Sequence, residues 1–506
     1  MRRTLRFRHD GTFRVLQMAD VQDGPDVDPD TVVLIEAAIR RADPDLVVFT
    51  GDQIRGYDPA WMHTFLRRRG ERPGDSVREV TRLEAWWRRR FGGPNQPGPD
   101  DWPAGALMAD ARAKVRRCFA GFLAPIVRAG VPFAATYGNH DFQCGILADE
   151  QDRIYREFPG CLNPDAQPDQ PGRIASSPSA PIPCEPGTFA LPVMASDGSN
   201  HIAMGVTLVN SGDYATEHPS RSDTIDGEPS SHLSPAARRA IGRNASRNAG
   251  PATSQADYAR DPRKIDLADS DGYGSPTPQA LAWLAESQRE MVRRNGDGRP
   301  VPAIAFQHIP PQEFYDCLKE VPAFTPNAVE GTRAFAGRCY VLDRSVCRPG
   351  SRLGEAIGCA DVNCGQVQTM VDAGGYFALF CGHDHKNAFV GHVDGLDLGY
   401  APTCGFASYG PKSRLRGIRL FEFHESDPSR YTTRMLTYGE LVGRRSRNET
   451  RVFFGDHLVT DGPSLRDQLR RPSVFVTLVG IAGGVAAAIG SACARGARRL
   501  LNRPSR

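Results

Sequence analysis

Residues 45–52 read DLVVFTGD, a nearly continuous apolar run that ends in a glycine and the carboxylate of Asp52. Such a run is typical of a strand that is buried on both faces of a sheet. Residues 13–20 (FRVLQMAD) alternate and also end in a carboxylate, that of Asp20. Between the two runs, residues 31–41 (TVVLIEAAIRR) repeat apolar positions at helical spacing. The three segments predict a strand, helix, strand unit.

The same pattern returns further along the chain. Three apolar runs end in polar motifs: 131–137 before GNHD, 301–307 before His308, and 376–381 before GHDH. In an open α/β sheet, ligands bind in the crevice beyond the carboxyl ends of the strands. We therefore predict an α/β fold with its functional site along one sheet edge.

Composition limits the class of protein. The chain has 506 residues, 40% of them hydrophobic, which excludes a wholly disordered or multi-span membrane chain. Its net charge is only +3, so no nucleic acid partner is expected. The twelve cysteines are scattered and the N-terminus has no apolar export signal, which favours free thiols and a cytoplasmic catalytic part.

Six side chains with metal-ligand chemistry follow the predicted strands. They are Asp20, Asp52, Asn139, His308, His383 and His385. Carboxylate oxygen, amide oxygen and imidazole together suit Mn, Fe, Zn or similar divalent ions. Two such ions can share one carboxylate and activate a water molecule for in-line attack on a phosphoester. The pattern predicts two divalent metal ions and a phosphorylated substrate.

The order of these motifs over residues 13–425 resembles the calcineurin-like metallophosphoesterases. Residues 271–274 (DGYG) and 307–310 (QHIP) resemble the branch that contains a yeast dosage-dependent cell-cycle regulator and the plant purple acid phosphatase 29. The resemblance implies a four-layer α/β sandwich, with two mixed β-sheets flanked by helices, in a catalytic domain over residues 1–460. Long insertions are expected at about 60–105 and 162–272, the latter partly disordered.

The resemblance also implies a role for each motif residue. Asp52 would bridge two metal ions, whose identity among Mn, Fe, Zn and Mg is open. Asp20 and His385 would bind the first metal ion. The second ion would be bound by Asn139, His308 and His383. A metal-bridging hydroxide would attack the phosphorus while His140 protonates the leaving oxygen, and Asp141 would orient the His140 ring.

Two departures from the family pattern concern the metals. The first motif of the family is Asp-x-His, but here residues 20–22 read Asp-Val-Gln. Gln22, Asp23 or water would take the place of the missing imidazole, which weakens that metal and favours harder ions. Purple enzymes use a tyrosinate from a GDxxY motif, and Tyr57 comes one position too late for it. No coloured ferric site is expected.

The C-terminal region has a membrane signature. Residues 474–494 contain no charge over 21 positions, which is long enough to cross a bilayer core of about 30 Å. The stretch predicts a single-pass anchor followed by a basic tail at 495–506, with a buried helix as the alternative. The missing export signal predicts that the catalytic domain is on the cytoplasmic side of the membrane. The arginines of the tail instead predict that the tail is on that side, and the two predictions conflict.

We predict a phosphomonoesterase from these observations. One alternative is a phosphodiesterase or nuclease, and another is a membrane-tethered binding module with weakened catalysis. Residues 400–409 are expected to form a strand and a glycine loop near the floor of the site. Arg414, Arg416 and Arg419 are candidates for contact with a phosphate. The natural substrate and the oligomeric state stay open.

Overall fold

The computed structural model describes residues 4–56, 58–61, 64, 104–165, 177–212, 273–459 and 462–481. Most of the insertion expected at about 60–105 lies outside the described residues. The stretch 213–272 of the second insertion lies outside them as well, and so do residue 482 and everything after it.

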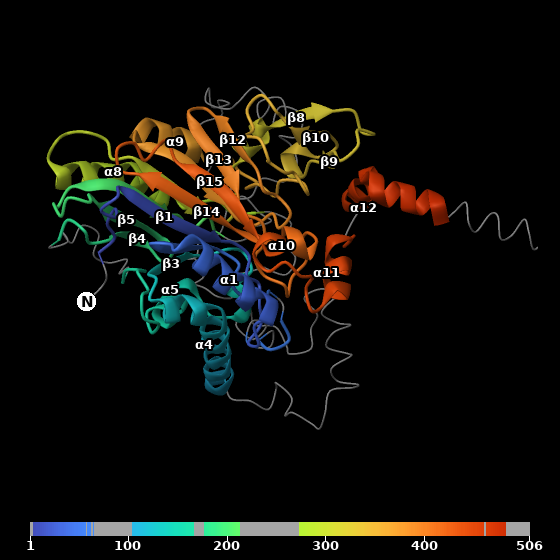
Figure 1. The fold of residues 1–506 in the computed structure, drawn as a ribbon, viewed down its shortest axis with the longest axis horizontal. Coiled ribbons are helices and arrows are strands. Elements are labelled where there is room, and N and C mark those ends of the chain that lie inside the picture. The colour runs from blue at the N-terminus through green and yellow to red at the C-terminus, as the bar shows by residue number, and fades with distance from the viewer. Residues whose placement is uncertain are drawn as a thin grey trace, which may run out of the picture.

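The first sheet has five strands in the order β15-β14-β1-β2-β3. Its parallel members are β1 (Thr12–Met18), β2 (Leu46–Thr50) and β3 (Phe133–Thr136). Its antiparallel members are β14 (Gly417–His424) and β15 (Thr432–Thr437). The predicted strand, helix, strand unit is present as β1, α1 (Pro29–Ala42) and β2, and α1 and α4 (Ala104–Ala129) cover the outer face of this sheet (Figure 1).

The second sheet has seven strands in the order β12-β13-β11-β7-β6-β5-β4. Its central strands are parallel: β6 (Ile202–Leu208), β7 (Ala303–Gln307), β11 (Tyr376–Cys381) and β13 (Leu396–Tyr400). Its antiparallel strands are β4 (Ile182–Glu185), β5 (Thr188–Met194) and β12 (Val390–Val393). Helices α8 (Pro278–Asn295) and α9 (Gln366–Ala373) lie on its outer face.

Side-chain alternation along the strands separates three apolar cores and so defines four layers. In β2, Val48 points between the two sheets, while Val47 and Phe49 point toward α1 and α4. In β7, Ile304 likewise lies between the sheets and Ala305 faces the α8 side. Successive strand residues point to opposite faces, so a strand covered on both sides reads as a continuous apolar run. The predicted four-layer sandwich of two mixed sheets is confirmed.

The range 162–272 is not simply a loop insertion, which corrects the sequence-based expectation. Strands β4, β5 and β6 lie within it and complete one side of the second sheet. Pro183 and Pro192 argue against strands in a single sequence because proline lacks the amide hydrogen of the ladder. The structure accommodates Pro192 because β4 pairs only with residues 188–190 of β5, which leaves that side of the strand open at Pro192.

A small three-stranded sheet and the C-terminal helices complete the described part. The sheet contains β8 (Leu318–Val321), β9 (Val329–Glu330) and β10 (Cys339–Leu342). The remaining α-helices are α5 (Ala148–Tyr155), α10 (Tyr438–Leu441), α11 (Glu449–Asp456) and α12 (Gly462–Arg470). Short 3₁₀ turns cover Asp141–Cys144, Gln312–Cys317, Arg333–Phe335 and Ser413–Leu415.

The C-terminal membrane prediction falls mostly beyond the described residues. Residues 472–481 are helical, but 482–494 lie outside the described part of the chain. Within that part, no helix has the length and apolarity that a bilayer crossing requires. The eleven cysteines of the described part are all free thiols.

Candidate metal centre

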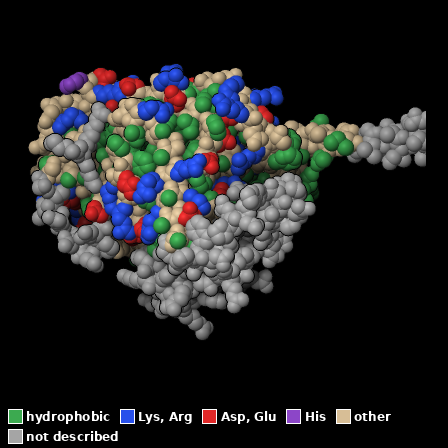
Figure 2. Space-filling view, turned by 90° about the horizontal axis from the view of Figure 1, so that it is seen from below, with side chains coloured by type: hydrophobic (Ala, Val, Ile, Leu, Met, Phe, Trp, Pro, Cys, Tyr) green, Lys and Arg blue, Asp and Glu red, His purple; other side chains and the backbone are tan. Residues whose placement is uncertain are grey.

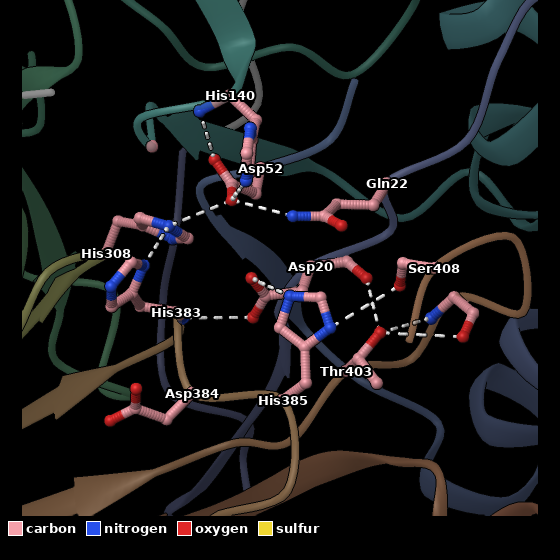
Figure 3. A network of polar contacts seen from close by, with 12 residues as sticks. Asp20, Gln22, Asp52, His140, His308, His383, Asp384, His385, Thr403 and Ser408 are labelled. Atoms are coloured by element: carbon pink, nitrogen blue, oxygen red, sulfur yellow. Dashed lines mark hydrogen bonds and ion pairs between the residues drawn. The ribbon is translucent and has the colours of Figure 1, made fainter. Parts of the chain in front are cut away.

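The carboxyl ends of five strands meet at one edge of the two sheets. β1, β2 and β3 are in parallel register, with Met18 beside Phe49 and Thr50 beside Thr136, so their following loops start at the same level. β7 and β11 end together in the second sheet, where Cys381 pairs with Gln307. The loops that follow carry all six predicted ligands and both predicted catalytic residues. The structure brings these eight residues into one site, as Figure 3 shows for most of them.

Several of these loops hold non-glycine residues in the left-handed backbone region. The φ angles are 53° at Asp20, 40° at Gln22, 54° at Asp52 and 77° at His383. These four are half of the eight such residues in the described part of the chain. Backbone of this kind costs of order 1–3 kcal/mol at each residue and persists where the surroundings enforce it, often at functional sites.

His308 is the centre of one half of the site. Its Nδ1 lies 2.9 Å from the carbonyl oxygen of Thr50, so Nδ1 carries the hydrogen and Nε2 points into the site. Nε2 is 3.2 Å from Asp52 Oδ2, 3.1 Å from Asn139 Oδ1 and 3.2 Å from His383 Nδ1. Four atoms that can serve as metal ligands thus converge on one buried point, and Asp52, His308 and His383 can offer ligand atoms within 4.8 Å of one another.

Asp20 and His385 form the other half. His385 Nδ1 lies 2.7 Å from the carbonyl oxygen of Tyr409, which leaves the lone pair of Nε2 facing Asp20 Oδ1 at 3.3 Å. Asp20 is fully buried and its Oδ1 accepts no hydrogen bond. Two facing acceptors without a hydrogen between them repel each other, so the arrangement calls for a proton or a cation.

Electrostatics also favours a cation at this site. Burial opposes ionisation of Asp52, but the adjacent imidazoles of His308 and His140 hold its pKa below the usual range. Burial lowers the pKa of His308 as well, yet the Asp52 and Asp20 carboxylates raise it to about 9. Burial and the nearby His308 lower the pKa of His383, which keeps that ring neutral. An anionic carboxylate and a neutral imidazole are the forms that bind metals, so Asp52 and His383 are in that form, whereas a metal ion would displace the proton that the raised pKa places on His308.

His140 lies beside Asp52 at the more open side of the site. Its Nε2 is 4.0 Å from Asp52 Oδ2 and its side chain is 26% exposed. The structure corrects the expected role of Asp141, because the ring nitrogen Nδ1 of His140 contacts Gln143 Oε1 at 2.7 Å instead. The Asp141 carboxylate accepts hydrogen bonds from four backbone amides: Asp52, Gln53, Ile54 and Gly138. Asp141 therefore holds the Asp52 loop, and Gln143 orients the ring.

Comparisons with known proteins found similar plant proteins. No protein-family model matches the chain. It is 21% identical over 443 residues to the probable inactive purple acid phosphatase 29 of Arabidopsis thaliana, covering 83% of this chain and 78% of the relative. It is also 21% identical to the probable inactive purple acid phosphatase 14 of the same plant, covering 83% and 77%. These relatives are purple acid phosphatase-like proteins of the calcineurin-like metallophosphoesterase superfamily, and the chain is similar to them over most of its length.

Two solved structures are also similar to the chain. A dimetal phosphatase from Danio rerio has a TM-score of 0.38 at 13% identity, covering 84% of this chain and 99% of that one. The protein TT1561 of Thermus thermophilus has a TM-score of 0.30 at 8% identity, with the same coverage.

The structure distinguishes between the two side chains that could replace the imidazole missing at position 22. Gln22 points into the site, and its Nε2 donates a hydrogen bond to Asp52 Oδ2 at 2.8 Å. Asp23 points away, because its carboxylate accepts from the Asp28 amide and the Thr31 hydroxyl at the start of α1. Rotation of the Gln22 amide by half a turn would present its oxygen in place of its nitrogen. Gln22 is therefore the candidate ligand, and Asp23 is structural.

The segment after β13 approaches the site as the sequence predicted, but its arginines do not. Arg416 and Arg419 are buried and donate to backbone carbonyls, Arg416 to that of Ser408 and Arg419 to that of Tyr400. Both guanidinium groups therefore support the loop and are not placed for contact with a phosphate. Thr403 in this loop donates to the carbonyl oxygen of Asp20 at 2.6 Å.

Two aromatic residues at the site were missed from the sequence. The Tyr409 ring stacks on His385 with centroids 4.1 Å apart, and the edge of Tyr273 meets His383 at 4.4 Å. These contacts fix the imidazole planes. Tyr273 belongs to the DGYG motif and Tyr409 ends the predicted glycine loop, but neither stretch indicated that its ring would contact an imidazole. Gln143 lies one short turn after His140 and could have been found from that spacing.

Proposed function

We propose that the protein is a hydrolase of phosphoesters, acting on phosphomonoesters with two divalent metal ions. The relatives support metal-dependent phosphoesterase chemistry at the general level. The observation that carries the proposal is the position of the Asp52 carboxylate. It contacts His308 on one side and, on the other, the Gln22 side chain and the backbone amide of His140 (Figure 3).

The residues fit such ions. Burial of two carboxylates, Asp20 and Asp52, carries a desolvation penalty of several kcal/mol each unless positive charge compensates it. Asp52 would be shared, with Asn139, His308 and His383 on one side and Asp20 and His385 on the other. Gln22 would add an amide oxygen to the second group. When bound, divalent ions lower the pKa of water and neutralise charge that develops on phosphoryl oxygens.

The side chains of this protein supply the remaining tasks. The backbone amide of His140 donates to Asp52 Oδ1 at 2.8 Å and so orients the shared carboxylate. Gln143 contacts the His140 ring through Nδ1, which leaves Nε2 on the side of Asp52, 4.0 Å from its Oδ2. A histidine in this position can donate a proton to the leaving oxygen. Burial lowers the pKa of His140, so the protonated ring is a stronger acid but a smaller fraction of the protein carries it near neutral pH.

A direct assay tests this proposal. The full chain in detergent, loaded with Mn²⁺ or Zn²⁺, should hydrolyse p-nitrophenyl phosphate faster than bis(p-nitrophenyl) phosphate. Treatment with a chelator should abolish turnover, and re-addition of metal should restore it, with about two ions per chain by elemental analysis. Faster cleavage of the diester would favour the phosphodiesterase alternative. Metal-replete protein that cleaves neither ester would refute the proposal.

Gln22→His distinguishes a working enzyme from a weakened binding module. The similar plant proteins are named probable inactive, and the departure at Gln22 gives the second hypothesis its basis. His tolerates a positive φ, so the variant should fold. We expect affinity for the weaker metal to rise by roughly tenfold, because an imidazole nitrogen replaces an amide, with little change in kcat at saturating metal.

Calorimetric titration of metal and steady-state kinetics would measure the two effects. A strong gain of kcat from an almost inactive parent would support the binding module instead.

The proposal also places the protein at a membrane. The uncharged stretch at 474–494 would act as a single-pass anchor, with the catalytic domain on the cytoplasmic side. Support comes from the sequence and from the helical, exposed residues 472–481.

A further inference from the structure

Large apolar side chains are exposed together at one end of the molecule. Among the described residues, only Val362 and Val371 of this kind lie elsewhere. We define the apolar platform as Phe324, Phe453, Phe454, Leu458, Leu465 and Leu469. The exposed fractions are 95% for Phe324, 67% for Phe454 and 58% for Phe453. Contiguous apolar surface of this kind marks an interaction site in a soluble domain.

The platform is one surface although it comes from three parts of the chain. Arg470 of α12 donates from Nε to the Ala323 carbonyl at 2.6 Å, next to Phe324. Gln468 of α12 donates to the Asp456 carbonyl at the end of α11 at 3.0 Å. These contacts join the loop after β8, α11 and α12. Phe324 therefore lies next to the contact with α12, which in turn contacts the end of α11.

The charged groups at the platform are paired within the protein. Arg466 forms a two-pronged contact with Glu330 at 2.6 and 2.7 Å, and Arg470 contacts Asp467 at 2.7 Å. Arg471 contacts Asp456 at 3.0 Å. Cations that are already neutralised offer little attraction to an acidic partner. The chemistry that matches the platform is an apolar medium.

The chain beyond the platform identifies that medium. Residues 472–481 continue from α12 as a helix whose apolar side chains are exposed, and they project away from the domain (Figure 1). Figure 2 shows hydrophobic side chains along this segment and at its base. The uncharged sequence that begins at residue 474 continues to residue 494, a length that suits a bilayer. The platform lies where such a segment would leave the membrane.

We propose that the apolar platform rests in the outer acyl region of a lipid bilayer and holds the catalytic domain against the membrane. The proposal rests on the membrane part of the proposed function and is independent of the reaction. Phenylalanine and leucine side chains on a surface helix partition into this region by burying apolar area. Anchor and platform together make two attachments, which restrict the orientation of the domain.

The platform also connects to the candidate metal centre. Gly455 of α11 packs so closely on the loop at Tyr409 that an added Cβ would lie 3.1 Å from the Tyr409 Cα. Lys386, next to His385, donates from Nζ to the Asp456 carbonyl at 3.0 Å. Tyr409 in turn stacks on His385. The helix that faces the membrane therefore supports the loop that orients one candidate ligand.

Photolabelling tests the platform in the full chain. The protein is reconstituted into phosphatidylcholine vesicles that contain a phospholipid with a diazirine on its acyl chain, irradiated, and mapped by mass spectrometry. We expect lipid adducts on the peptides with Phe453, Phe454 and Phe324 as well as on 474–494. Adducts confined to 474–494 would overturn the platform while leaving the anchor intact.

A charged variant and a matched control sharpen the test. Phe453→Asp with Phe454→Asp should remove labelling of α11 and keep labelling of 474–494, with unchanged phosphoester hydrolysis in detergent. Val371→Asp, at a 39% exposed position on α9, should leave all labelling as it is. Native mass spectrometry in nanodiscs tests the alternative that a second copy of the chain binds the platform. A dimer that dissociates in the Phe453→Asp variant would overturn the proposal in favour of a second copy of the chain.

Discussion

Asp52→Asn should lower kcat/KM for a phosphomonoester by about 10³-fold, the largest effect expected in this protein. The carboxylate lies 3.2 Å from His308 and accepts hydrogen bonds from the His140 backbone amide on Oδ1 and from the Gln22 side-chain amide on Oδ2. An asparagine of the same shape keeps one oxygen and loses the charge. Of the two buried carboxylates, Asp20 and Asp52, only Asp20 then carries negative charge to compensate two cations. A shared ligand is lost as well. Steady-state kinetics with metal in excess, together with metal content, measures the effect.

Asp397→Asn is a matched control for Asp52→Asn. Asp397 is a buried carboxylate on β13 that accepts from Tyr431 and contacts His392 at 3.0 Å, away from the site. The same change there should lower thermal stability and leave kcat/KM and metal content unaltered. If Asp52→Asn kept more than about a tenth of wild-type turnover, catalysis by a shared carboxylate would be excluded.

Gly138→Ala should lower turnover by about 10²-fold without unfolding the protein. A Cβ at this position would lie 2.3 Å from Asp52 Oδ1 and 2.6 Å from His308 Nε2. Gly138 has an ordinary φ, so the added methyl group strains no backbone and acts on the two side chains alone. They must move apart by several tenths of an ångström or more, which disturbs the positions of reacting groups. Kinetics and a thermal melt of the same sample measure this effect.

Gly395→Ala separates a local clash from general destabilisation. Gly395 lies in the turn between β12 and β13 with φ of +83°, and a Cβ there would meet nothing within 4 Å. Alanine in the left-handed region costs about 1–2 kcal/mol of stability, so this variant should melt earlier but keep its turnover. Equal loss of turnover in the two variants would contradict the steric argument at Gly138.

The range 182–208 shows where sequence reasoning failed on the fold. The strands that end in polar motifs were visible because each has a continuous apolar run of its own. β4 and β5 carry prolines and lie toward one edge of the second sheet, where a missing amide hydrogen is tolerated. Their strand character depends on which side of each strand has a partner. That information is absent from a single sequence.

The site shows the same limit at the level of single side chains. The family resemblance implied that Asp141 orients the His140 ring, yet the Asp141 oxygens accept from the backbone amides of the Asp52 loop. Gln22 and Asp23 are also neighbours, and the backbone at Gln22 turns one into the site and the other toward α1. A one-residue step reverses the direction of a side chain, so proximity in sequence does not assign a partner.

The sequence alone determined which donor groups meet, because parallel strands place their carboxyl ends at one sheet edge and each motif follows such an end. The order of the motifs carried the family resemblance, and that resemblance implied the four-layer architecture. Only the tertiary structure decided which atom of each donor faces the site. The Thr50 and Tyr409 carbonyls select the free ring nitrogens of His308 and His385, and Thr50 lies 258 residues from His308 along the chain. Contacts over such separations arise from packing of the two sheets, which local sequence patterns do not encode.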